Sequence, residues 1–183
     1  MAELPRNYRQ ESPEVYYSDA RVVLAGQEDV AFVKAAAAAN PRGRARLCTH
    51  RGTDDALHEM LIVHRQDVYV RPHAHVGKSE SFLVIEGEAV AVLFHESGGI
   101  ERAVEMAPFG VGRCFYYRMP EGVFHTLLIR SDWLVFHEAT TGPFDRVTTA
   151  FPHWAPDGSD AGATRDYLDS LWRAVGKIPV RAS

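Results

Sequence analysis

Arg71-Pro72-His73-Ala74-His75-Val76-Gly77-Lys78-Ser79-Glu80 is the most informative stretch of the chain, and an apolar run follows it up to Gly87. His73 and His75 are two residues apart in a segment that proline keeps extended. Side chains at positions i and i+2 of a strand point to the same face, so the two imidazoles are predicted to converge. With Glu80 they form a three-ligand set that is typical of a divalent transition metal and leaves room for water or substrate.

A second motif supplies a fourth candidate ligand. In Pro120-Glu121-Gly122-Val123-Phe124-His125, a tight turn is predicted to place His125 at the start of an apolar strand. The alternative for His125 is a structural histidine that is hydrogen-bonded to a neighbour. The other histidines of the chain are interpreted as structural.

The spacing His-x-His-x4-Glu-x6-Gly, followed by Pro-x-Gly-x2-His, resembles the two metal-binding motifs of the cupin superfamily. The resemblance implies that His73, His75, Glu80 and His125 bind one divalent transition metal per chain (Fe, Zn, Mn or Ni). Three positions depart from the family pattern, where Gly, Gly and Asn are usual. They are Asp67, Cys114 and Ile129, and they concern loop geometry more than metal binding.

Within the cupins, residues 71–82, Tyr116-Tyr117, His125-Thr126 and 137–144 are similar to the WbuC family of metalloproteins. That resemblance covers roughly residues 44–155. It implies a mainly β fold, a single cupin-type jelly-roll β-barrel, and a role in surface-polysaccharide or related biosynthesis. A homodimer is expected because many cupins are dimers.

Local patterns agree with this fold class. Short apolar segments separated by Gly and Pro turns predict strands at 46–50, 58–64, 68–71, 81–85, 89–94, 100–106, 114–118, 124–129 and 133–138. A helix is expected over 27–40 and an amphipathic helix over 164–175. Residues 1–14 are expected to be a loose arm, with brief strands at 15–17 and 22–24. The predicted organisation is an N-terminal arm and helix (1–43), a cupin β-barrel (44–155) and a C-terminal helical extension (156–183).

Several residues near the ligands are candidates for substrate contacts or catalysis. Arg71 and Lys78 could hold an anionic substrate, with solvated rim charges as the alternative. Tyr117 is a further substrate-binding candidate, and Tyr116, Tyr117 and Lys78 are the candidate catalytic groups, although an aromatic core strand explains the tyrosines equally well. His137-Glu138 is interpreted as a structural pair rather than as a pair that supports the metal.

Composition limits the function classes. The chain of 183 residues has a net charge of −4, 24% charged and 46% hydrophobic residues, which is typical of a globular domain and unlike a nucleic-acid-binding protein. No signal peptide or membrane span is evident, and Cys48 and Cys114 form no paired motif, so a cytoplasmic protein is expected.

The sequence favours a metalloenzyme, an isomerase, epimerase or dioxygenase, acting on a small polar and possibly sugar-derived substrate. The alternatives are a non-catalytic ligand-binding cupin, whose metal is structural or orients the ligand, and an iron-dependent dioxygenase.

Overall fold

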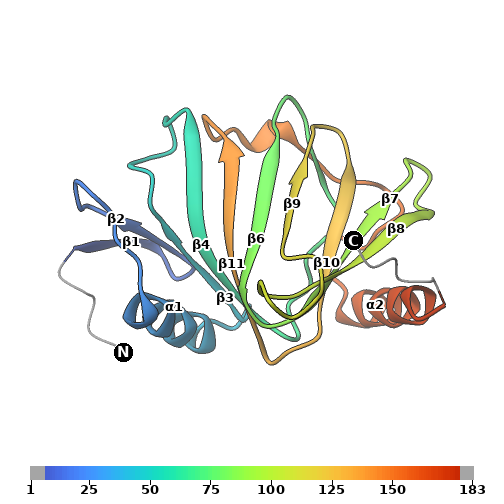
Figure 1. Ribbon diagram of the computed structural model, residues 1–183. Coiled ribbons are helices and arrows are strands. Elements are labelled where there is room, and N and C mark those ends of the chain that lie inside the picture. The colour runs from blue at the N-terminus through green and yellow to red at the C-terminus, as the bar shows by residue number, and fades with distance from the viewer. Residues whose placement is uncertain (1–6, 178–183) are drawn as a thin grey trace.

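The computed structural model describes residues 7–177 and consists of two facing β-sheets with one helix outside each (Figure 1). The larger sheet has seven strands in the order β1-β2-β3-β4-β11-β6-β9. Their bounds are Tyr8–Ser12, Val15–Ser18, Arg44–Cys48, Leu57–Arg65, Trp133–Thr141, Glu80–Glu86 and Tyr116–Met119. Neighbouring strands are antiparallel except for the parallel pair β2–β3.

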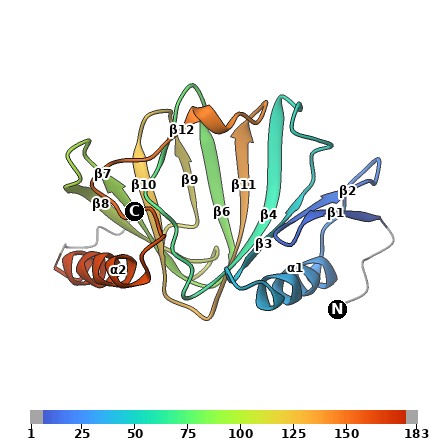
Figure 2. The same ribbon diagram turned by 180° about the vertical axis from the view of Figure 1, so that it is seen from behind.

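The smaller sheet has the order β10-β7-β8, with bounds Phe124–Ile129, Ala89–Phe94 and Ile100–Met106. Next to β10 lies the two-stranded pair of β5 (Ala74–His75) and β12 (Thr149–Ala150), which Figure 2 shows from behind. A 3-10 turn, Arg146–Thr148, precedes β12. The sheets do not close into a continuous barrel. The mainly β fold predicted from the sequence, with one helix in the N-terminal region and one in the C-terminal region, is confirmed.

Two expectations for the N-terminal region are wrong in detail. The segment from residue 8 is not a loose arm, because β1 and β2 form a hairpin that extends the large sheet. No strand forms at 22–24, where Val22 and Leu24 are exposed and have no neighbouring strand to pair with. Residues 1–6 lie outside the described part of the chain.

The helix α1 (Gln27–Ala39) covers the outer face of the large sheet. It begins where the Asp29 carboxylate accepts a hydrogen bond from the Gly26 amide at 2.7 Å, which satisfies one free N–H of the first turn. Val33 and Ala37 are fully buried against Leu47 and Val63 of β3 and β4. The small alanine side chains allow close approach of the helix to the strands, and they make an apolar layer outside the sheet.

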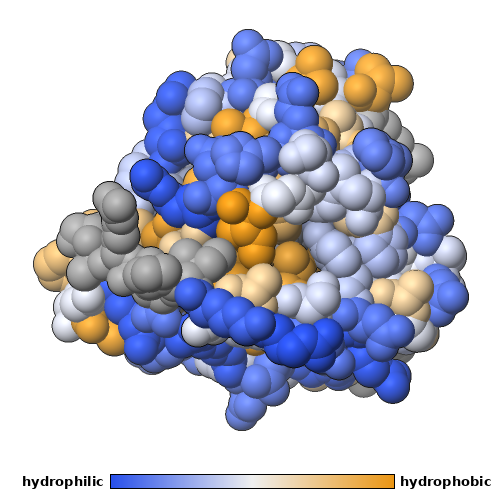
Figure 3. Space-filling view, turned by 90° about the vertical axis from the view of Figure 1, so that its right-hand side faces the viewer, coloured by the Kyte–Doolittle hydropathy of each residue, from blue (hydrophilic) through white to orange (hydrophobic). Residues whose placement is uncertain are grey.

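The helix α2 (Ala161–Val175) lies outside the small sheet in the same way. Leu171 and Val175 are buried with Val90 and Val92 of β7. The exposed surface of this side of the molecule is mostly hydrophilic, with a smaller apolar patch at its centre (Figure 3). No helix within residues 7–177 combines the length and the apolar character that a membrane crossing requires.

The remaining core fills the space between the sheets. Phe82, Phe136 and Met106 are its largest fully buried side chains. The tight turn between β6 and β7 requires a glycine. Gly87 has a φ of 86°, and a Cβ atom there would lie 2.1 Å from the Trp133 carbonyl oxygen. The interior core ends toward the β5 side, where the side chains become polar and the candidate site begins.

Candidate metal centre

Three histidines meet at the edge of the small sheet. His73 and His125 face each other across an isolated bridge, in which each backbone amide donates to the other's carbonyl at 3.1 and 2.9 Å. His75 follows two residues later in β5, on the same face as His73. One ring nitrogen from each of the three lies within 4.8 Å of the others, a spacing suited to a shared metal ion.

Glu80 comes from the opposite sheet, at the start of β6, and only 4% of it is exposed. Its Oε2 lies 3.0 Å from His75 Nε2, and its Oε1 lies 3.2 Å from His125 Nε2. The four predicted ligands are therefore brought together in one cluster, although they come from three strands and a bridge.

Backbone carbonyls orient two of the imidazoles. His73 Nδ1 lies 2.8 Å from the Arg71 carbonyl, and His125 Nδ1 lies 2.9 Å from the Val123 carbonyl. A carbonyl only accepts, so Nδ1 of both rings carries a proton and Nε2 is the nitrogen that can face a metal. In His125 this Nε2 lies against the Glu80 carboxylate, so a bound metal would take the place of the shared proton. A neutral imidazole with a free Nε2 is the form that binds a metal, so this donor set fits a divalent transition metal.

The pKa values of the cluster are shifted by burial and by the contacts among its members. Burial lowers the pKa of His73 to about 4, so its ring stays neutral at physiological pH. Burial opposes ionisation of Glu80, but hydrogen bonds with His125 and His75 prevail and lower the pKa of its carboxyl group. In turn, Glu80 outweighs burial and raises the pKa of His125. The cluster therefore holds an anionic carboxylate beside imidazoles. A metal cation bound there would take the place of the protons that these groups share.

Tyr117 and Glu138 lie beside this cluster on the inner face of the large sheet. Their strands place Glu138 opposite Phe82, and Phe82 opposite Tyr117. The Tyr117 hydroxyl donates to Glu80 Oε1 at 3.0 Å, and its ring stacks on Phe82 with centroids 5.1 Å apart. Burial and the nearby Glu80 carboxylate raise the pKa of Tyr117, so the phenol keeps its proton and acts as a donor.

Glu138, which the sequence was interpreted to place in a structural pair, lies at the site. Burial and then the charge of Glu80 raise the pKa of Glu138 to about 7. The expected pairing of His137 with Glu138 is wrong, because successive strand residues face opposite sides. The ring of His137 instead approaches Glu59, with 3.8 Å between His137 Nε2 and Glu59 Oε1. The alternation of β11 was the available signal, since the residue after an outward-facing His137 must point inward.

The other residues predicted for substrate binding or catalysis lie in different surroundings. Tyr116 is 46% exposed and does not share the position of Tyr117. Lys78 donates from Nζ to the Pro143 carbonyl in a loop that follows β11. The Arg71 guanidinium lies over the Phe151 ring, 4.4 Å from its centroid, and Phe151 in turn lies 6.4 Å from the His73 ring.

Comparisons with known proteins agree with the fold. A family model described as a domain of unknown function, DUF6016, matches residues 25–106. The crystal structure of protein SO0799 from Shewanella oneidensis is similar over 75% of this chain and 87% of that one, with 8% identity and a TM-score of 0.50. At such low identity, the likeness concerns the fold alone.

Two further similar structures cover less of the chain. A Klebsiella pneumoniae protein with a double-stranded β-helix domain has 12% identity and a TM-score of 0.46, over 60% of this chain and 79% of that one. The capsular polysaccharide assembling protein CapF from Staphylococcus aureus has 20% identity and a TM-score of 0.45, over 58% of this chain. The chain spans 34% of CapF and 21% of the Brassica napus procruciferin. No curated protein matches the sequence.

Proposed function

We propose that this protein is a metal-dependent enzyme that acts on a small polar, sugar-derived molecule. His73, His75, His125 and Glu80 are the proposed ligands of one divalent transition metal. The observation that carries the proposal is the convergence of three imidazole nitrogens within 4.8 Å, next to a carboxylate that is 4% exposed. The role in surface-polysaccharide or related biosynthesis rests on the sequence resemblance to the WbuC family.

The residues around the cluster divide the chemical work. When bound, the metal would act as a Lewis acid that polarises an oxygen of the substrate. Tyr117 holds Glu80 in place through its hydroxyl, which fixes the orientation of this ligand. Glu138 is the proposed proton acceptor and donor, because its carboxyl group has a pKa near neutrality in the metal-free protein. Proton transfer at a carbon next to a carbonyl is the reaction class that such a pair of groups supports.

Metal analysis is the first test. Protein purified without chelator or immobilised nickel is expected to contain close to one equivalent of metal per chain. His75→Ala is expected to abolish this content, whereas the matched control His95→Ala retains it, because His95 is 61% exposed and far from the cluster in sequence. Metal content in wild type no higher than in His75→Ala would contradict the proposal.

Proton exchange tests catalysis separately from binding. In deuterated water, an isomerase or epimerase transfers deuterium to a substrate carbon, which NMR detects in a screen of sugars and sugar derivatives. Glu138→Gln is expected to slow this exchange by about 10²–10⁴-fold while metal content stays near one equivalent. Stoichiometric metal with ligand binding but no exchange or oxygen consumption would instead support a non-catalytic binding protein.

A further inference from the structure

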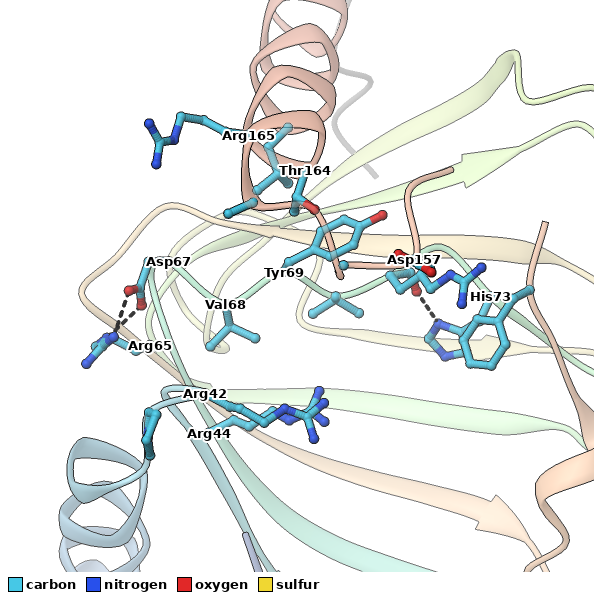
Figure 4. Close-up of a pocket in the computed structure, with 17 residues that line it drawn as sticks. Arg42, Arg44, Arg65, Asp67, Val68, Tyr69, His73, Asp157, Thr164 and Arg165 are labelled. Carbon is cyan, nitrogen blue, oxygen red and sulfur yellow. Dashed lines mark hydrogen bonds and ion pairs between the residues drawn. The ribbon is translucent and has the colours of Figure 1, made fainter. Parts of the chain in front are cut away.

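A second group of polar side chains lines a cavity of about 880 Å³ that reaches His73 and lies between the start of α2, residues 65–73 and the start of β3 (Figure 4). Its wall includes five arginines but only two aspartates, and it also includes His73. The arginines are Arg42, Arg44, Arg65, Arg71 and Arg165. This volume is in the range of small-molecule sites. An excess of arginines around a cavity is unexpected in a chain whose net charge is −4.

A second, smaller cavity shares a lining residue with this one. The shared residue is Arg44, and the smaller cavity, of about 170 Å³, is also lined by Arg46 and His64. Arg44 and Arg46 alternate along β3 with Ala45 and Leu47, which are buried on the α1 side. The two arginines therefore project between the sheets, where Arg46 also lowers the pKa of Glu138.

Several donors in these two cavities have no partner. Within the described residues, Arg46 Nε, Arg71 Nε and His64 Nδ1 are buried and form no hydrogen bond. Leaving such groups unpaired costs about 1–3 kcal/mol each, and more for charged groups. Burial also lowers the pKa of His64 to about 3, so its ring is neutral and can donate one hydrogen bond. The acceptor oxygens of a bound polar molecule would satisfy donors of this kind.

Three of the other arginines of the larger cavity are paired with carboxylates. Arg42 and Arg44 share one carboxylate, Glu14, at 3.0 and 2.9 Å, and run side by side in Figure 4. Arg65 pairs with Asp67. The amides at the start of α2 are not free for a ligand, because the Asp160 side chain already accepts from Gly162 and Ala163. The arginines, rather than the helix, therefore give this cavity its excess of positively charged groups.

We propose that the two cavities bind the phosphate group of an organic phosphate substrate, with Arg44, Arg46 and Arg71 as its main contacts and Arg42 at the entrance. Guanidinium groups match phosphate oxygens with paired hydrogen bonds. Arg71 stacks on Phe151, which lies beside His73, so a phosphate at Arg71 would leave the sugar part of the molecule next to the proposed metal site. This inference rests on the proposed function for its reacting group, but the phosphate site itself does not require the metal.

Titration calorimetry on the metal-free full-length chain tests the site, with inorganic phosphate, glucose 1-phosphate and glucuronate as probes. Wild type is expected to bind both phosphates with one site per chain and to unfold at a higher temperature in their presence. Arg46→Gln and Arg71→Gln are each expected to weaken binding about 10-fold or more. Arg71→Lys serves where Arg71→Gln does not fold, and it is expected to weaken binding less.

Arg173→Gln is the matched control, because Arg173 is exposed on α2 and does not line either cavity. It is expected to bind phosphate within twofold of wild type. Equal binding by wild type, Arg46→Gln and Arg71→Gln would overturn the inference, as would glucuronate binding as tightly as glucose 1-phosphate. Metal content, measured on protein of the same variants before the metal is removed, reports separately on the metal proposal, so failure of one does not decide the other.

Discussion

The two faces of the large sheet differ sharply, although they are built from the same strands. The outer face, under α1, is closed and apolar, with Leu47, Val63 and Val135 fully buried. The inner face begins as an apolar core and then carries Glu80 and Glu138. Burial of apolar groups stabilises a fold, and burial of ionisable groups costs stability. The difference teaches that the helix-covered layer stabilises the sheet and leaves the inner face available for polar groups.

The largest expected effect is on the inner face. His125→Ala removes a proposed ligand and is expected to weaken metal binding about a thousandfold, or about 4 kcal/mol, since loss of a mere outer-shell partner already costs 10–100-fold. Metal titration of the variant measures this, and far-UV circular dichroism checks that the sheets remain folded. Unchanged metal affinity in a folded variant would remove His125 from the ligand set.

A core substitution on the outer face is expected to act on stability alone. Leu47→Ala leaves a cavity beneath α1 and is expected to lower the free energy of unfolding by about 3 kcal/mol. Denaturant unfolding measures this change. The folded fraction of the variant is expected to bind metal as wild type does, and a large loss of metal affinity would show that the two faces are not independent.

The smallest effect concerns pH. The pKa of Glu138 is raised to about 7 in the folded chain from an ordinary value of 4.5. The free energy of unfolding that the protonated carboxyl group contributes is therefore fully present below pH 4.5 and is lost as the pH rises through 7. Glu138→Gln removes this loss. The metal-free variant is expected to be more stable than wild type at pH 8 by about 1–3 kcal/mol and to lose that advantage near pH 4.5.

Thermal unfolding of both proteins across this pH range gives the comparison. If the stability curves of wild type and Glu138→Gln run parallel between pH 4.5 and 8, ionisation of Glu138 does not destabilise the fold. Glu138 is then not a buried acid.

The convergence of His73, His75 and Glu80 could be predicted because it depends on local spacing and on a motif that is read directly from the chain. Most strand positions were predictable for the same reason, since Gly and Pro turns mark the strand ends. The first hairpin was not, because the segment of β1, Tyr-Arg-Gln-Glu-Ser, has no apolar alternation and forms by pairing with β2.

The inward direction of the β3 arginines could not be predicted, for a tertiary reason. The alternation Arg44-Ala45-Arg46-Leu47 indicates a strand with one polar and one apolar face, and the polar face normally points to solvent. Here α1 covers the apolar face, so the arginines point between the sheets. Only the position of α1 shows that the polar face of β3 points inward. The local sequence of β3 does not reveal where that helix packs.

The unclosed edge between the sheets has a consequence for the speed of binding. The larger cavity reaches the surface beside α2, and Arg42 at its entrance has a side chain that is 63% exposed. The net charge of −4 repels an anionic molecule at long range, and the arginines of the proposed phosphate site would attract it at this entrance. Such a local field steers ligands and raises the association rate, and dissolved salt weakens it. The association rate of a phosphorylated ligand would then fall with rising ionic strength, with little change in the rate at which the ligand leaves.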